Sequence, residues 1–130
     1  MRKLSFGRKY KNQKFTIDGI TFDSIREAHR YEELKELQTA GIIQDLKLQV
    51  EFILIPTQYA PPAGVYKSGK NKGKPKQGKI LERKCSYIAD FVYRENDETV
   101  VEDVKGMRTK DYVIKRKLML YMHGIKIREV

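Results

Sequence analysis

Apolar residues alternate with other residues from Leu46 to Ile55, and Pro56 ends the pattern. A period of two places such side chains on one face of a β-strand. Residues 86–93 and 99–105 are rich in tyrosine and valine and also predict strands. A chain with these segments has to bury at least one face of a sheet, and helices are the usual cover.

Two segments, residues 24–39 and 109–123, predict helices that end close to a glycine. A β-hairpin is predicted around Asp18-Gly19, and residues 125–130 predict a closing strand. We therefore expect an α/β fold, with a mixed sheet flanked by helices. The elements after the hairpin follow the order α-β-β-β-α-β, and the length of 130 residues fits a single domain spanning residues 1–130.

Basic residues are concentrated in two segments. Residues 1–14 carry a net charge of +6 and residues 60–84 carry +7, in a chain whose net charge is +10. Residues 60–79 contain six lysines and four glycines, so they are too polar to bury a core, and we expect a mobile loop or a hairpin arm. Such appendages suit a polyanionic partner, and solvated flexible tails are the alternative.

Several functional classes are excluded at this stage. No apolar run approaches the length of a membrane span, and no apolar face accompanies the lysines, so we expect nucleic acid and no membrane as the partner. The first residues are basic and lack the apolar stretch of a secretory signal. Cys85 is the single cysteine, so no disulfide framework can form, and a cytoplasmic protein is expected.

Two carboxylates and a lysine are candidates for chemistry. Asp90 lies in the apolar sequence Ile88-Ala89-Asp90-Phe91-Val92, where burying a charge is costly without compensation. Asp103 and Lys105 lie two residues apart in the next strand, so they share a face. A five-residue polar turn makes the two strands antiparallel neighbours, and Asp90 and Asp103 can then converge at one end of the sheet.

Oxygen ligands of this kind suit a hard cation, Mg²⁺ or Mn²⁺. Asp90, Asp103 and the backbone carbonyl of Val104 would be the ligands. Such a metal activates water and offsets charge on a phosphate, while Lys105 can orient that water and stabilise the transition state. The alternative is that Asp103 and Lys105 form a solvated surface pair.

The first helix adds a third group of residues: Ser24, Glu27, Arg30 and Tyr31. Together with Asp90 and the Asp103-x-Lys105 strand, this order resembles the PD-(D/E)XK nuclease superfamily, which has a restriction-endonuclease-like fold. The likeness covers about residues 20–130. Ala89 replaces the proline that precedes the first aspartate of that family. The resemblance implies that Glu27 completes the acidic cluster.

The resemblance also implies an activity. The small members of this superfamily include bacteriophage endonucleases and Holliday-junction resolvases, so we expect a Mg²⁺-dependent deoxyribonuclease of phage recombination or replication. It would act in bacterial or phage-infected host cytosol. Branched DNA is the favoured substrate, and a homodimer is an open alternative to a monomer. The lysines expected to contact phosphates are Lys67, Lys70, Lys72, Lys74, Lys76, Lys110, Lys115 and Lys117, besides the basic stretch 1–14.

Several alternatives stay open. Glu27 can equally serve a capping box with Ser24. Glu102 could replace Asp103 as a ligand only if the strand register shifted by one, so it ranks second. His29 and Glu33 are four apart on a helix but lack a third zinc ligand. At the level of function, the protein could be a non-catalytic nucleic-acid-binding protein that retains the nuclease fold, or a structural subunit whose arm binds an acidic protein.

Overall fold

The computed structural model describes residues 14–105 and 107–130, so most of the basic N-terminal segment lies outside the described residues. The chain forms two compact units. The described residues of the first unit are 14–50, 89–105, 107 and 127–130, and those of the second unit are 51–88 and 108–126. The single domain predicted from the sequence stays a prediction.

The chain begins with the predicted hairpin. Strands β1 (Phe15–Ile17) and β2 (Ile20–Phe22) pair antiparallel, and Asp18 and Gly19 both have positive φ, as a type I′ turn requires. Helix α2 (Ile25–Thr39) follows. Ser24 caps its start by accepting a hydrogen bond from the backbone N–H of Glu27 at 3.1 Å. The hairpin and the first helix are therefore confirmed.

A mixed four-stranded sheet has the order β3-β6-β7-β8. Its strands are β3 (Gln44–Ile55), β6 (Cys85–Glu95), β7 (Glu98–Asp103) and β8 (Arg128–Glu129). β6 and β7 are antiparallel, whereas β7 and β8 are parallel. β7 ends two residues earlier than predicted. β8 is shorter than the predicted closing strand because it pairs only with Glu102 and Asp103 of β7.

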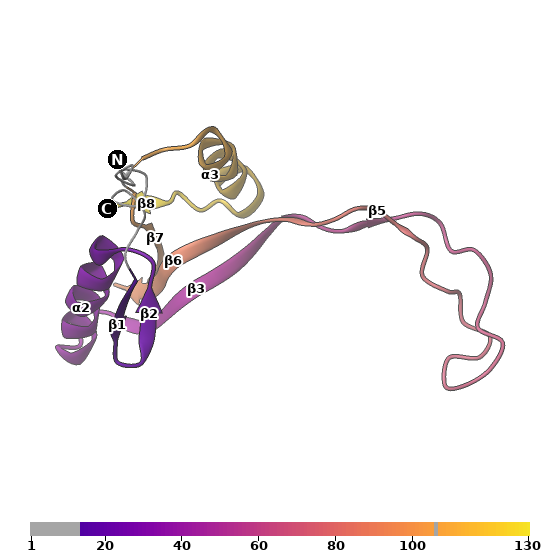
Figure 1. Ribbon diagram of the computed structural model, residues 1–130, viewed down its shortest axis with the longest axis horizontal. Coiled ribbons are helices and arrows are strands. Elements are labelled where there is room, and N and C mark those ends of the chain that lie inside the picture. The colour runs from indigo at the N-terminus through magenta and orange to yellow at the C-terminus, as the bar shows by residue number, and fades with distance from the viewer. Residues whose placement is uncertain (1–13, 106) are drawn as a thin grey trace, which may run out of the picture. The chain divides into compact units, whose positions relative to one another are not determined.

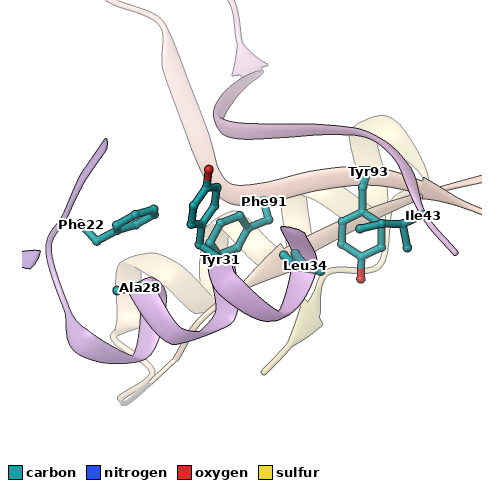
Figure 2. Close-up of a cluster of buried hydrophobic side chains, with 7 residues drawn as sticks. All are labelled: Phe22, Ala28, Tyr31, Leu34, Ile43, Phe91 and Tyr93. Atoms are coloured by element: carbon teal, nitrogen blue, oxygen red, sulfur yellow. The ribbon is translucent and has the colours of Figure 1, made fainter. Parts of the chain in front are cut away.

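The first unit has its core between α2, the hairpin and the sheet. Figure 2 shows its buried side chains, and those from α2 lie close to Phe91 and Tyr93 of β6. Val100 of β7 packs against the same cluster, as does Val104 just after the strand, and Glu102 between them is bonded to Arg30 of α2, so these alternate residues face α2. Asp103 therefore points to the other side of that strand. The buried cluster consists of Phe22, Ala28, Tyr31, Leu34, Ile43, Phe91 and Tyr93.

The second unit contains helix α3 (Lys110–His123) and a long antiparallel ribbon. Thr109 caps the start of α3, and Gly124 ends it in the left-handed conformation with φ of 67°, as predicted. Tyr112 and Met119 are its buried side chains. The ribbon includes strands β4 (Gln58–Tyr59) and β5 (Ile80–Glu82), which pair antiparallel at its base (Figure 1).

Candidate active site

Asp90 and Asp103 face each other at the end of the antiparallel pair of β6 and β7. The pairs Val92↔Val101 and Phe91↔Glu102 set a register in which Asp90 and Asp103 come next. The two carboxyl groups share a hydrogen bond, and Oδ2 of Asp90 also accepts one from the backbone N–H of Val104 at 2.8 Å. The structure thus brings together the two carboxylates that the sequence predicts to converge.

The Asp90 carboxyl group is held in an unfavourable environment for its charge. Burial raises its pKa to about 7, and the nearby charges of Asp103 and Glu27 act in the same direction. The hydrogen bond from Val104 opposes them. A cation bound beside such a carboxyl group would stabilise its charged form and so offset the electrostatic cost of ionising it.

Lys105 supplies the nearby positive charge. Its Nζ lies 3.0 Å from Oδ1 of Asp103, whose side chain is buried, whereas that of Lys105 is half-buried. Nη1 of Arg26, on α2, donates to the carbonyl oxygen of Lys105 at 3.1 Å. Sequence reasoning missed Arg26. Its hydrogen bond holds the chain just after β7, where the lysine side chain turns back toward Asp103.

Glu27, in the first turn of α2, is within electrostatic reach of the same cluster. Burial is the largest cause that raises its pKa, and the charges of Asp23 and Asp103 raise it further, whereas the charge of Lys105 lowers it. Ser24 also lowers it through a side-chain hydrogen bond. Glu27 therefore lies at the capped start of α2 and takes part in the charge balance around Asp103. Its role in a metal site stays a prediction.

Glu102 lies on the opposite side of β7 from Asp103. Its carboxylate has 0% exposure and accepts two hydrogen bonds from Arg30 and one from the hydroxyl of Tyr93. The strand register is therefore not shifted, and the structure gives no support to Glu102 as a replacement ligand. Sequence reasoning missed this network. The signal was a carboxylate at a core-facing position of a valine-rich strand, which requires a buried partner.

A pocket of about 260 Å³ lies beside α2 in the first unit. Arg30 and Glu33 on its wall form an ion pair at 2.9 Å, and Val104 connects it to the end of β7. Two arginines of α2 therefore line a hollow that reaches the strand end carrying Asp103. The lining residues are Arg26, His29, Arg30, Glu33, Val104 and Val130.

The lysines predicted to contact nucleic acid lie in the second unit. Five of them are exposed on the ribbon: Lys67, Lys70, Lys72, Lys74 and Lys76. The other three are on α3, where Lys110 and Lys117 are exposed and Lys115 is half-buried. Also in this unit, Cys85 is a free, half-buried thiol, and His123 in the last turn of α3 contacts the carbonyl oxygen of Ile53 at 2.7 Å.

The donor chemistry of the cluster can be compared with that of metal sites. Within residues 14–105 and 107–130, no three His, Cys, Asp or Glu side chains are arranged to hold a metal ion together. Mg²⁺ is usually held by only one or two carboxylates, with waters and substrate phosphates completing its shell. The carboxyl groups of Asp90 and Asp103 fit that pattern.

The fold and this cluster define an α/β protein with paired acidic side chains beside a lysine at a sheet end. A comparison with family models places the chain, over residues 7–129, in a family described as a protein of unknown function, DUF1064, and the chain belongs to that family. No curated protein matches it, and no solved structure does. None of the helices in the described part of the chain is long and apolar enough to cross a membrane.

Proposed function

We propose that this protein is an endonuclease that uses Mg²⁺ or Mn²⁺ to hydrolyse DNA phosphodiester bonds, on a restriction-endonuclease-like core. The observation that carries the proposal is the hydrogen-bonded pair of Asp90 and Asp103, with Lys105 3.0 Å from Asp103. Two carboxyl groups held together cost electrostatic energy that a cation would offset. The order of these residues along the chain also matches the superfamily that the sequence resembles.

Each residue has a distinct role in this proposal. Asp90 and Asp103 hold the cation, with the carbonyl group of Val104 as a further oxygen ligand and Glu27 completing the acidic cluster directly or through water. When bound, the cation acts as a Lewis acid that offsets the charge developing on the phosphate oxygens. The backbone N–H of Val104 donates a hydrogen bond to Oδ2 of Asp90, and this bond keeps the Asp90 carboxylate oriented toward the end of β7.

Lys105 has the most specific chemical task. Its ammonium group lies beside Asp103, where it can donate a hydrogen bond to the attacking water and to an anionic phosphate oxygen. Arg26 positions the backbone of Lys105 by donating a hydrogen bond to the carbonyl oxygen of Lys105. An ammonium group held in this position stabilises the transition state more than the ground state, which is the condition for a faster chemical step.

The proposed substrate is DNA, with a branched junction as the favoured form in phage recombination or replication. Paired cuts on a symmetric junction would require a homodimer. The lysines of the ribbon and of α3 would hold phosphates without reading sequence.

A second candidate is a non-catalytic nucleic-acid-binding protein. The observation that favours it is the ribbon itself, in which residues 60–79 carry six lysines and no acidic residue. Such a segment gives affinity for a polyanion whether or not a reaction follows.

The test is a cleavage assay on linear duplex, single-stranded, flapped and four-way DNA, with Mg²⁺, with Mn²⁺ and with a chelator. We expect cleavage of at least one substrate that requires the divalent cation. Binding without cleavage on every substrate and with both metals would overturn the enzyme proposal and leave the binding protein. Cleavage that persists in chelator would overturn the metal site.

A further inference from the structure

The ribbon of the second unit is an ordered two-stranded structure, although its composition is that of a loop. Ala60 N–H donates to the Lys79 carbonyl at 2.7 Å, and Lys76 N–H donates to the Gly64 carbonyl at 3.1 Å. Farther out, Tyr66 N–H donates to the Lys74 carbonyl at 3.0 Å. Figure 1 shows the two strands running to a common tip. Backbone pairing, without a core, therefore defines this segment.

The two strands of the ribbon approach each other closely near its base. A Cβ atom on Gly78 would lie 1.9 Å from the carbonyl oxygen of Ala60, so only glycine fits at this position. At the tip, Gly69 and Gly73 adopt positive φ of 81° and 84°. The glycines thus permit a narrow ribbon with a tight end, and do not by themselves imply flexibility.

The surface of the ribbon is exposed and positively charged. Every residue from 61 to 77 is exposed, and the lysines of this range have no acidic residue near them in sequence. The ammonium group of Lys76 lies over the ring of Tyr66, 5.9 Å from its centre, as in a cation–π contact. A narrow, cationic rod of this kind has the features of a ligand for a polyanionic groove.

We propose that this ribbon, residues 58–82, inserts into the major groove of B-form duplex DNA. The major groove is about 12 Å wide and admits a two-stranded β-ribbon, whose strands lie about 4.8 Å apart. The deep, narrow major groove of A-form RNA does not admit side chains in this way, so the geometry favours DNA. The inference rests on the proposed DNA substrate but not on hydrolysis.

The first test measures the charge contribution of the ribbon. Lys70→Gln, Lys72→Gln and Lys74→Gln are combined in one variant, and binding to a duplex of about 21 base pairs is followed by fluorescence anisotropy in chelator. The control variant carries an equal loss of charge on exposed lysines outside the ribbon. Its substitutions are Lys35→Gln, Lys47→Gln and Lys126→Gln.

The slope of log affinity against log salt should fall by about 0.9 for each phosphate that the ribbon variant no longer neutralises. Between 50 and 200 mM salt, the affinity of the wild type should therefore drop about 40-fold more than that of the ribbon variant. The control variant should keep the wild-type slope. Equal slopes for the wild type and the ribbon variant would overturn the proposal and favour an acidic protein as the partner of the ribbon.

The second test addresses the groove. The probe is a duplex whose cytosines carry glucosylated 5-hydroxymethyl groups, which project into the major groove, compared with the unmodified duplex and with an RNA duplex of the same sequence. A shortened variant replaces residues 64–76 with Asn-Gly, a sequence suited to a two-residue hairpin. Because these residues have no core, the remaining chain is expected to fold, and circular dichroism checks this.

The wild type should bind the glucosylated duplex more weakly than the unmodified one, by about the factor that separates it from the shortened variant on unmodified DNA. The shortened variant should not distinguish the two duplexes. If the wild type binds both duplexes equally, or if shortening weakens RNA binding as much as DNA binding, the ribbon does not enter the major groove. Glucose sensitivity without any cleavage would support this inference while the proposed hydrolysis fails.

Discussion

Arg30 on α2 holds the buried carboxylate of Glu102 on β7 with two hydrogen bonds, Nε–Oε1 at 2.8 Å and Nη2–Oε2 at 2.6 Å. The hydrogen bond to Glu102 raises the pKa of Arg30, and burial together with the same carboxylate raises the pKa of the Tyr93 hydroxyl to about 12. This bidentate pair ties the helix to the strand on the side opposite Asp103. It therefore stabilises the register that directs Asp103 toward Asp90.

Replacing Arg30 with methionine should lower the free energy of unfolding by about 3–5 kcal/mol, because the carboxylate of Glu102 is then buried without its partner. Urea denaturation of the two proteins measures the difference. Arg94→Met is the matched control, since it removes an arginine whose partner Asp97 is fully exposed, and no measurable change is expected. A loss below about 1 kcal/mol for Arg30→Met would show that the pair does not hold α2 to β7.

Asp90 should make stability depend on pH. Its pKa in the folded protein, about 7, lies above the value near 4 of an unfolded chain, so the folded state binds more protons between these two values. In chelator, the free energy of unfolding should therefore fall as the pH rises from about 4 to about 7. Asp90→Asn should flatten this part of the profile.

The control for the pH profile is Asp97→Asn, which changes an exposed carboxylate in the turn between β6 and β7. It should leave the wild-type slope between these pH values unchanged. An Asp90→Asn profile that keeps the wild-type slope would assign the pH dependence to other groups and remove the electrostatic argument for a cation at this position.

Divalent cations should stabilise the folded protein through the same carboxylates. At a Mg²⁺ or Mn²⁺ concentration about 100 times the dissociation constant, binding to the folded state adds about 2.7 kcal/mol. Thermal denaturation should show a rise in the midpoint for the wild type and none for Asp90→Asn or Asp103→Asn. Glu98→Gln, which removes an exposed carboxylate from the same β7 strand, should respond like the wild type.

Cleavage should depend on Asp103 and Lys105 far more than binding does. Asp103→Asn and Lys105→Ala should each lower the cleavage rate by a factor of about 10²–10³, the scale of losing one transition-state stabiliser. DNA affinity measured in chelator should stay at the wild-type level or rise for Asp103→Asn, because a negative charge is removed. Lys126→Ala is the control for the lysine, and variants that cut as fast as the wild type would remove these residues from the mechanism.

Local sequence signals were sufficient for the first turn and for the ends of the helices. The Asp18-Gly19 turn, the Ser24 cap and Gly124 each depend on the conformational preferences of one or two residues, and the structure has all three as predicted. Closing strand β8 was overpredicted, because its length depends on how much of β7 offers a parallel partner. That is a property of the assembled sheet and has no signal within residues 125–130.

Part of the candidate site follows from local sequence patterns, and part depends on packing between distant segments. Alternation along the predicted strand 99–105 placed Asp103 and Lys105 on one side, and the short turn to β6 brought Asp90 opposite, so this pairing follows from local patterns in the chain. Packing between distant segments, by contrast, buries Glu102 against Arg30 and brings Arg26 to the carbonyl of Lys105. Those interactions join residues more than seventy positions apart. Side-chain periodicity describes one segment at a time, whereas the partner of a buried charge is set by which segments pack together.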